Sequence, residues 1–217
     1  QDLVEANIKT IFEYQFVSSE LSIGDFRLDT LAFDEQNNSF VIIEYKKGHS
    51  YSVVDQGYSY LSIMLNNKAE FILEYNEKNK ETLKRSDVDW SLSKVIFIAP
   101  SFNAYQKNSI NFKDVPFELW EIKQFEKSLV SFEQYLPSSS ESIQKISSSD
   151  KSSVISKVSS EIKSMSEEHH LNILDDSKKP LWRALKEKIE SYPETSFFAS
   201  KSYISWKKNN KTVCFIH

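Results

Sequence analysis

Two carboxylates and a lysine in the first fifty residues have the types and spacing of a metal-dependent hydrolytic site. Glu44 and Lys46 lie two positions apart at the end of an apolar run, and Asp29 lies within an earlier apolar run. Side chains alternate between the faces of a strand, so Glu44 and Lys46 would share a face, about 7 Å apart. Charges at the end of an apolar strand cost solvation free energy unless they are paired or used.

Asp29 adds a second carboxylate if its strand lies beside the strand that carries Glu44. Two close carboxylates repel each other, which raises the pKa of one of them. A divalent cation between them removes that repulsion. Oxygen ligands suit Mg²⁺ or Mn²⁺, which would activate water and neutralise charge on a phosphate. Lys46 would orient the water or stabilise the transition state. The alternative for a Glu-x-Lys pair is a surface ion pair worth under about 1 kcal/mol.

The elements that would position these residues form an α/β pattern. Four apolar runs predict strands, at residues 26–34, 40–47, 94–99 and 117–122. The polar turn at residues 35–38 predicts an antiparallel hairpin, and the nearly all-apolar run at 94–99 is typical of a strand buried on both faces. Helices are expected at residues 2–14 and 53–78, the second broken near Asn66. We therefore expect a mixed sheet flanked by helices.

A change of composition divides the chain into three predicted parts. Residues 1–136 would form the α/β domain. Residues 137–166 would form a serine-rich linker, since residues 137–163 contain 12 serines. The spacing of Val154, Val158 and Ile162 predicts an amphipathic helix within that linker. Residues 167–217 would form a small α+β domain, which we expect to be incomplete because about 50 residues build only a thin core.

Composition excludes several classes of protein. The 217 residues are 40% hydrophobic, which supports a buried core and argues against disorder. The single cysteine, Cys214, cannot form an intrachain disulfide, and the sequence has no run of about 18 apolar residues to span a bilayer. These features favour a cytoplasmic protein. With a net charge of −4, a nucleic-acid-binding face would have to be a local basic patch.

The pattern of these residues resembles the PD-(D/E)XK nuclease superfamily, whose restriction-endonuclease-like core is a mixed sheet flanked by helices. The resemblance rests on Asp29, on the run Glu44-Tyr45-Lys46, and on Gln56 with Tyr60, which match a Gln-x-x-x-Tyr element on the following helix. The segments RLDTLAFD, VIIEYKKG and FELWEIK are similar to a bacterial family that joins such a domain to a small C-terminal domain of unknown function. More distantly, the chain resembles archaeal branched-DNA and mismatch endonucleases.

This resemblance implies a catalytic set of Asp29, Glu44, Lys46, Gln56, Glu5 and Tyr60. Asp29 and Glu44 would hold Mg²⁺ or Mn²⁺ together with the backbone carbonyl of Tyr45. Lys46 would be the catalytic lysine, supported by Gln56. By the same resemblance, Tyr60 would approach a phosphate and Glu5 would be an auxiliary acid. Position 28 is leucine, where the superfamily motif has proline.

Basic residues near the motif and further along the chain are candidates for phosphate contacts, namely Lys47, His49, Lys84 and Arg85. Solvated surface is the alternative for each. We therefore expect a Mg²⁺-dependent DNA endonuclease in repair or defence, with DNA as its partner, no membrane association and a homodimer left open. The alternative function is a non-catalytic nucleic-acid-binding or interaction module on the same fold.

Overall fold

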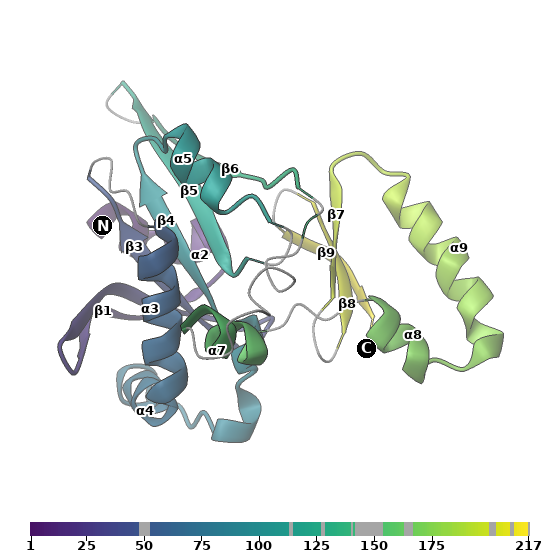
Figure 1. Ribbon diagram of the computed structural model, residues 1–217, viewed down its shortest axis with the longest axis horizontal. Coiled ribbons are helices and arrows are strands. Elements are labelled where there is room, and N and C mark those ends of the chain that lie inside the picture. The colour runs from purple at the N-terminus through teal and green to yellow at the C-terminus, as the bar shows by residue number, and fades with distance from the viewer. Residues whose placement is uncertain are drawn as a thin grey trace. The chain divides into compact units, whose positions relative to one another are not determined.

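The computed structural model describes residues 1–47, 53–112, 115–126, 129–139, 141, 154–162, 167–199, 203–208 and 211–216 (Figure 1). The chain divides into two compact units, Gln1–Lys163 and Ser164–His217. The first unit is built on a mixed six-stranded sheet flanked by helices, which confirms the expected α/β fold class. Among the helices in these described ranges, none has the length and apolar character needed to cross a membrane.

The sheet of the first unit joins antiparallel strands through a parallel centre. In spatial order its strands are β1 (Gln15–Ile23), β2 (Phe26–Asp34), β3 (Ser39–Tyr45), β4 (Lys94–Ala99), β5 (Phe117–Phe125) and β6 (Leu129–Tyr135). β4 pairs in parallel with both β3 and β5, and the other neighbours are antiparallel. The carboxyl ends of β3, β4 and β5 therefore meet at the same edge of the sheet.

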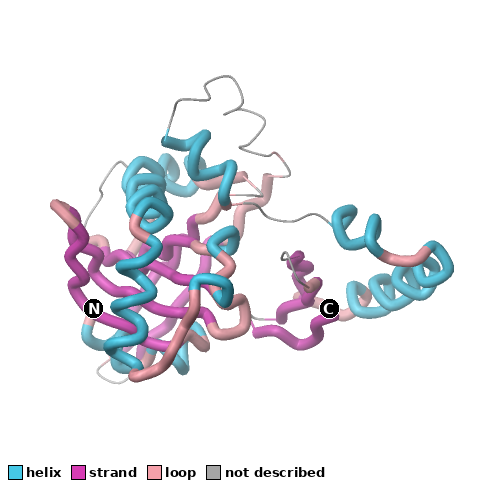
Figure 2. Tube along the Cα trace, turned by 90° about the horizontal axis from the view of Figure 1, so that it is seen from below, coloured by secondary structure: helices cyan, strands magenta, loops and turns pink. Residues whose placement is uncertain are grey.

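Helices cover both faces of this sheet (Figure 2). The longer helices are α3 (Val53–Asn66), α4 (Lys68–Asn79) and α7 (Val154–Glu161), and the shorter ones are α1 (Asp2–Ala6), α2 (Ile8–Phe12) and α5 (Ala104–Ser109). Two 3₁₀ turns, Arg85–Asp87 and Trp90–Leu92, precede β4. The predicted break near Asn66 is confirmed, whereas the helix predicted at 2–14 is two short helices that meet at Asn7, whose φ is −124°.

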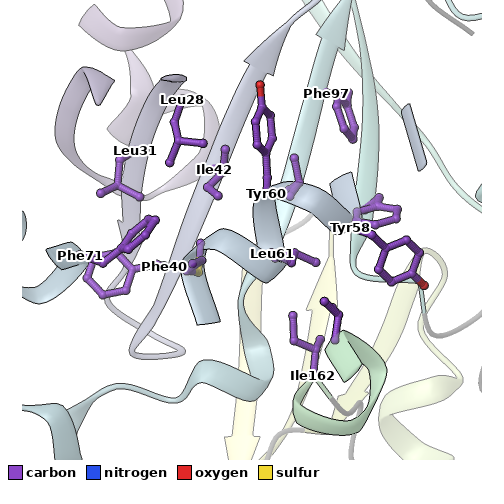
Figure 3. Close-up of a cluster of buried hydrophobic side chains, with 14 of the residues drawn as sticks. Leu28, Leu31, Phe40, Ile42, Tyr58, Tyr60, Leu61, Phe71, Phe97 and Ile162 are labelled. Carbon is purple, nitrogen blue, oxygen red and sulfur yellow. The ribbon is translucent and has the colours of Figure 1, made fainter. Parts of the chain in front are cut away.

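Side-chain alternation sorts the buried residues into two clusters. The first lies under α3, α4 and α7 and includes Phe40, Ile42, Leu61, Phe71, Phe97 and Ile162 (Figure 3). The second lies under α1 and α2 and includes Val4, Ile8, Val41, Ile43, Ile96 and Ile98. Because β4 contributes to both clusters, it is buried on both faces, as predicted.

Gly57 allows α3 to approach the sheet closely. A Cβ atom at this position would lie 2.5 Å from Cε1 of Phe117, well inside van der Waals contact. The Phe117 ring is itself packed edge-on against Tyr58, with centroids 4.9 Å apart. The close approach therefore places the first turns of α3 directly on the amino end of β5.

The helix predicted within the linker belongs to the first unit. Val158 and Ile162 join the first core cluster, and Lys68 Nζ lies 2.6 Å from Glu161 Oε2. The first unit therefore extends to Lys163 rather than ending at residue 136. The apolar stripe of α7 is buried against α3. This contact depends on tertiary packing, which the serine-rich composition of the segment does not reveal.

The second unit is a small α+β fold. Its elements are α8 (Glu167–Ile173), a 3₁₀ turn (Asp176–Lys178), α9 (Lys179–Glu190) and an antiparallel sheet of β7 (Thr195–Ala199), β8 (Ile204–Lys208) and β9 (Lys211–Ile216). Trp182 and Trp206 meet at its centre, with ring centroids 5.4 Å apart. Its buried cluster contains only Trp182, Ala199, Ile204 and Trp206 among the described residues, so the core is thin, as expected for this length.

Candidate active site

β2 and β3 separate where the acidic residues begin. Their pairing ends at Thr30 and Ile43, one residue short of Asp29 and Glu44. The Asp29 side chain replaces the missing backbone partner, because its Oδ2 accepts a hydrogen bond from the N–H of Tyr45 at 3.0 Å. Asp29 is therefore fixed beside the segment that carries Glu44.

The carbonyl of Tyr45 faces the side on which Asp29 lies. The N–H of the next residue, Lys46, donates to the carbonyl of Ile98 in β4 at 2.8 Å. Backbone N–H and C=O groups alternate sides from residue to residue along a strand. Both backbone groups of Tyr45 therefore point away from β4 and towards β2, so a carbonyl oxygen and a carboxylate share the space where the strands separate.

Both carboxylate oxygens of Glu44 accept hydrogen bonds from side chains. Oε1 accepts from Lys46 Nζ at 3.2 Å and from Gln56 Nε2 at 2.9 Å, and Oε2 accepts from the Tyr60 hydroxyl at 2.9 Å. Gln56 also accepts from Lys46 through Oε1 and donates to Tyr60. Gln56 and Tyr60 are one turn apart on α3, and Figure 3 shows the Tyr60 hydroxyl pointing along the sheet, away from Phe71.

The Glu44 carboxylate is unfavourably placed without a further cation. Burial raises the pKa of Glu44 above its ordinary value, and the nearby charge of Asp29 raises it further. Lys46 and the Tyr60 hydrogen bond oppose this shift. Burial, and then the charge of Glu44, also raise the pKa of Tyr60, which therefore remains a hydrogen-bond donor at neutral pH.

The donors at this place fit a small divalent cation. Asp29 and Glu44 offer carboxylate oxygens and Tyr45 offers a backbone oxygen, the ligand types that Mg²⁺ and Mn²⁺ prefer. Within the part of the chain that the structure describes, no protein donor hydrogen-bonds to Asp29 Oδ1. The same residues contain no group of three His, Cys, Asp or Glu side chains suited to a metal ion. Such a cation would therefore depend on the carbonyl and on water for its remaining ligands.

Glu5 lies on the opposite face of the sheet from Glu44. The Thr30 hydroxyl donates to Glu5 Oε1 and lies 3.2 Å from the Tyr45 hydroxyl, and the Gln1 amide donates to the same Glu5 oxygen at 3.0 Å. Glu5 therefore supports β3 from behind, and its link to Asp29 runs through the Gln1 amide, which also donates to the Asp29 backbone carbonyl at 3.2 Å. Sequence reasoning missed Thr30, although a threonine inside the apolar run of β2 was a usable signal.

A cleft of about 1220 Å³ opens over these strand ends. Its charged lining residues are Asp2, Glu20, Arg27, Asp29, Glu44, Lys46 and Lys47. Sequence reasoning did not single out Asp2, Glu20 or Arg27 as site residues, because they are charged residues in exposed positions. Arg27 Nη1 lies 3.7 Å from Glu20 Oε1 and both side chains are largely exposed, so the guanidinium remains accessible to an anion.

The other predicted phosphate contacts lie elsewhere. The N–H of Asp89 donates to the carbonyl of Asn38 at 2.7 Å, which attaches the segment after Lys84 and Arg85 to the amino end of β3. Glu44 is six residues beyond Asn38, which is about 20 Å at the usual rise per residue of a strand. Lys84 and Arg85 are exposed and are not among the described residues that line the cleft. His49 lies outside the described residues.

Comparison with family models finds no family model that matches the chain. An uncharacterized protein of Haemophilus influenzae is 45% identical over 210 residues, which cover 96% of this chain and 69% of that protein. The shared region therefore includes both units.

Three solved structures show weaker likeness. EndoMS in a complex with double-stranded DNA matches 57% of this chain and 44% of its own, at 19% identity and a TM-score of 0.38. A repair endonuclease from Pyrococcus abyssi matches 55% of this chain and 44% of its own length, at 19% identity and a TM-score of 0.31. Pyrococcus furiosus SfsA in complex with Ca²⁺ matches 62% of this chain and 63% of its own length, at 11% identity and a TM-score of 0.31. This chain thus spans less than half of the length of the first two.

Proposed function

We propose that this chain, which belongs to the same family as the Haemophilus influenzae protein, is a divalent-metal-dependent nuclease that hydrolyses phosphodiester bonds in DNA. One observation carries the proposal. Two carboxylates, a backbone carbonyl and a lysine meet at the carboxyl end of β3, where β2 and β3 have separated and a cleft opens. The Glu44–Lys46 ion pair does not need the second carboxylate, because the charge of Asp29 raises the pKa of Glu44 and so opposes that pair.

Asp29, Glu44 and the Tyr45 carbonyl are the groups that would hold Mg²⁺ or Mn²⁺. When bound, such an ion lowers the pKa of water and neutralises charge on the attacked phosphate. Asp29 is kept ready by the Tyr45 N–H, and Glu44 is oriented by Tyr60 and Gln56. Each carboxylate therefore keeps its place before an ion arrives, which lowers the entropic cost of binding it.

Lys46 is the group that would act on the substrate. Its ammonium would repel a cation, so its contribution is to the phosphate and to the attacking water. Gln56 and Glu44 fix its Nζ, and the Phe97 ring lies beneath it, 5.9 Å from centroid to Nζ. The side chain is only 12% exposed. A charge that is both positioned and desolvated stabilises a transition state better than a mobile surface lysine does.

The test is cleavage of labelled single-stranded, duplex and branched DNA with Mn²⁺, by wild type and by Lys46→Ala. Because Lys46 acts mainly in the transition state, the variant should lose detectable cleavage while its affinity for DNA stays within a few-fold. Glu44→Ala should lose cleavage and also the metal dependence of DNA binding. Cleavage that persists in Glu44→Ala would rule out this site.

The non-catalytic binding module predicts a different result for the same panel. Wild type would then cut none of the substrates, yet would bind DNA as tightly as Lys46→Ala does. Adding EDTA would leave that affinity unchanged, since no metal would bridge Asp29, Glu44 and a phosphate. Repair and defence are both compatible with a nuclease of this kind.

A further inference from the structure

The hairpin of β5 and β6 extends past the rest of the sheet beside the cleft. β4 pairs with β5 only as far as Ala99 and Glu121, whereas β5 and β6 remain paired from there to Phe125 and Leu129. Four residues of β5, starting at Ile122, thus continue as a two-stranded ribbon for about 13 Å. Figure 1 shows this ribbon reaching beyond the ends of β3 and β4. Ile122, at its base, lines the cleft.

The far end of the ribbon carries two exposed apolar side chains. Phe125 and Leu129 are direct cross-strand partners, and they are 49% and 63% exposed. Cross-strand partners project from the same face of the ribbon, so the two side chains form one apolar surface. Leaving both in water has a free-energy cost that a folded protein normally avoids by burial.

Strand register fixes where this apolar pair lies relative to the carboxylates. Glu44 is in register with Phe97, which is in register with Leu119. Phe125 is six residues beyond Leu119, about 20 Å along the strand, and two strands from β3, about 10 Å across. By alternation Phe125 projects on the same face as Leu119, which packs in the cluster that contains Ile42 on the Glu44 face. Ile122 projects on the opposite face, and the cleft at the strand ends is lined by residues of both faces.

We propose that the ribbon inserts Phe125 and Leu129 among the bases of duplex DNA that occupies the cleft. The inference rests on the proposed nuclease function and deepens it, because it names base-paired DNA as the substrate class. A duplex with one phosphate at Glu44 must pass the ribbon tip about 22 Å away, which is about six base-pair steps at ~3.4 Å each. Apolar wedges of this kind unstack base steps and kink a duplex.

The charges of the ribbon favour bases over phosphates as the contact. Lys123 lies 3.5 Å from Glu121 and 3.6 Å from Glu133, so its charge is shared with two carboxylates. Glu121 also binds Lys107 at 2.8 Å. With Glu121, Glu126 and Glu133 against Lys123, the described part of the hairpin has a net negative charge and offers a phosphate no attraction. Its apolar pair offers the stacking surface that bases use.

The test compares variants in a Lys46→Ala background, so that DNA is bound without being cut. The disruptive variant is Phe125→Ser with Leu129→Ser, and the conservative one is Phe125→Leu with Leu129→Met. Leu73→Ser is the matched control, because Leu73 on α4 is 52% exposed and lies outside the cleft lining. The measurements are duplex and single-strand affinity by anisotropy, fluorescence of 2-aminopurine placed at successive positions of the duplex, and sedimentation. Cleavage by otherwise wild-type protein is mapped in parallel.

The serine pair should weaken duplex binding about ten-fold, which corresponds to the loss of one good stacking contact. Its affinity for single-stranded DNA should fall less than about three-fold. The serine pair should also abolish a rise in 2-aminopurine fluorescence about six base pairs from the mapped cut. The conservative pair and Leu73→Ser should retain both signals. Unchanged duplex binding and fluorescence in the serine pair, with wild type still cutting DNA, would overturn the inference and leave the nuclease standing.

Two further results would also overturn it. If wild type sediments as a dimer and the serine pair as a monomer, the ribbon tip is a contact between copies of this chain. If wild type neither binds nor cuts any DNA with Mn²⁺, the proposed function fails and the inference fails with it.

Discussion

The Tyr60 hydroxyl donates to Glu44 Oε2 at 2.9 Å and accepts from Gln56 Nε2 at 2.7 Å. One phenol therefore orients both the acid of the site and the amide that holds Lys46. The phosphate contact that the resemblance implies for Tyr60 stays a prediction; in the structure its side chain is only 6% exposed and its hydroxyl contacts Glu44. This places its effect on the carboxylate.

Tyr60→Phe should move the acid limb of the pH–activity profile to higher pH. The Tyr60 hydrogen bond lowers the pKa of Glu44, so its loss lets burial and Asp29 raise that pKa further. Because the ionised carboxylate is the active form, kcat/KM should fall at a higher pH than in wild type. Tyr58→Phe is the control, since Tyr58 is also buried on α3 but packs on Phe117. Equal profiles for the two variants would contradict this role.

Glu44→Gln should stabilise the metal-free protein at neutral pH. The pKa of Glu44 in the native state is raised above its ordinary value of 4.5. At a pH between 4.5 and the native pKa, the native state therefore binds more protons than the unfolded state. Stability is therefore lost as pH rises through the native pKa, and glutamine avoids that loss. We expect a Tm higher by a few degrees at pH 7, with the difference vanishing below about pH 4. Mn²⁺ should raise the Tm of wild type but not of Glu44→Gln.

Glu5→Gln should retain most activity, whereas Glu5→Ala should not. The amide oxygen of glutamine can still accept from Thr30, so β3 keeps its support, and alanine leaves the buried Thr30 hydroxyl without that acceptor. The loss of stability in Glu5→Ala should be about 1–3 kcal/mol by denaturant unfolding. Abolished cleavage in a stably folded Glu5→Gln would instead favour the auxiliary-acid role that the resemblance implies.

Gly57→Ala should destabilise the protein by about 1–3 kcal/mol, because the new methyl group would overlap the buried Phe117 ring. It should also reduce cleavage, since Gln56 and Tyr60 move with α3. Ser59→Ala, two residues along the same helix, is the control and should be nearly neutral. Thermal unfolding of both variants, with cleavage rates, is the measurement. A Gly57→Ala protein as stable as wild type would mean that α3 is not held this closely.

Lys47→Ala should reduce the salt dependence of DNA binding by about one unit in log–log slope, because Lys47 is exposed in the cleft. Lys84→Ala with Arg85→Ala should change it less, because their segment attaches at the other end of β3. Titrations at several salt concentrations distinguish the two sites. A larger effect from the second pair would mean that DNA follows the sheet away from the cleft.

Strong alternation and uniform apolar runs made the centre of the sheet predictable from sequence. β2, β3 and β4 each have a paired strand on both sides, so their side chains are buried and their sequences are apolar. The polar turn between β2 and β3 marks their hairpin. β1 and β6 were missed because they are the edge strands, where only one side is paired. β1 is also interrupted by an irregularity between Phe16 and Ser18, which breaks its alternation. Edge strands tolerate polar residues on both faces, so their periodicity is weak.

The parts of the site that depend on long-range packing could not be inferred from spacing. Glu44 and Lys46 are neighbours in one strand, so their shared face followed from alternation. Glu5 and Glu44, in contrast, lie on opposite faces because α1 packs behind the sheet and α3 in front of it, and no local pattern fixes that choice. The position of α7 against α3 has the same origin, since the intervening residues carry no pattern that links the two helices.

The burial of Val158 and Ile162 under the first unit has a consequence for the order in which the chain is made. All six strands of the sheet have been synthesised by Tyr135, yet the apolar surface beside α3 still lacks part of its cover. That cover arrives only after the serine-rich stretch has left the ribosome. A nascent chain that has emerged from the ribosome as far as Pro137 can therefore form its sheet while it still exposes a hydrophobic site. Until α7 emerges as well, any other apolar segment can occupy that surface.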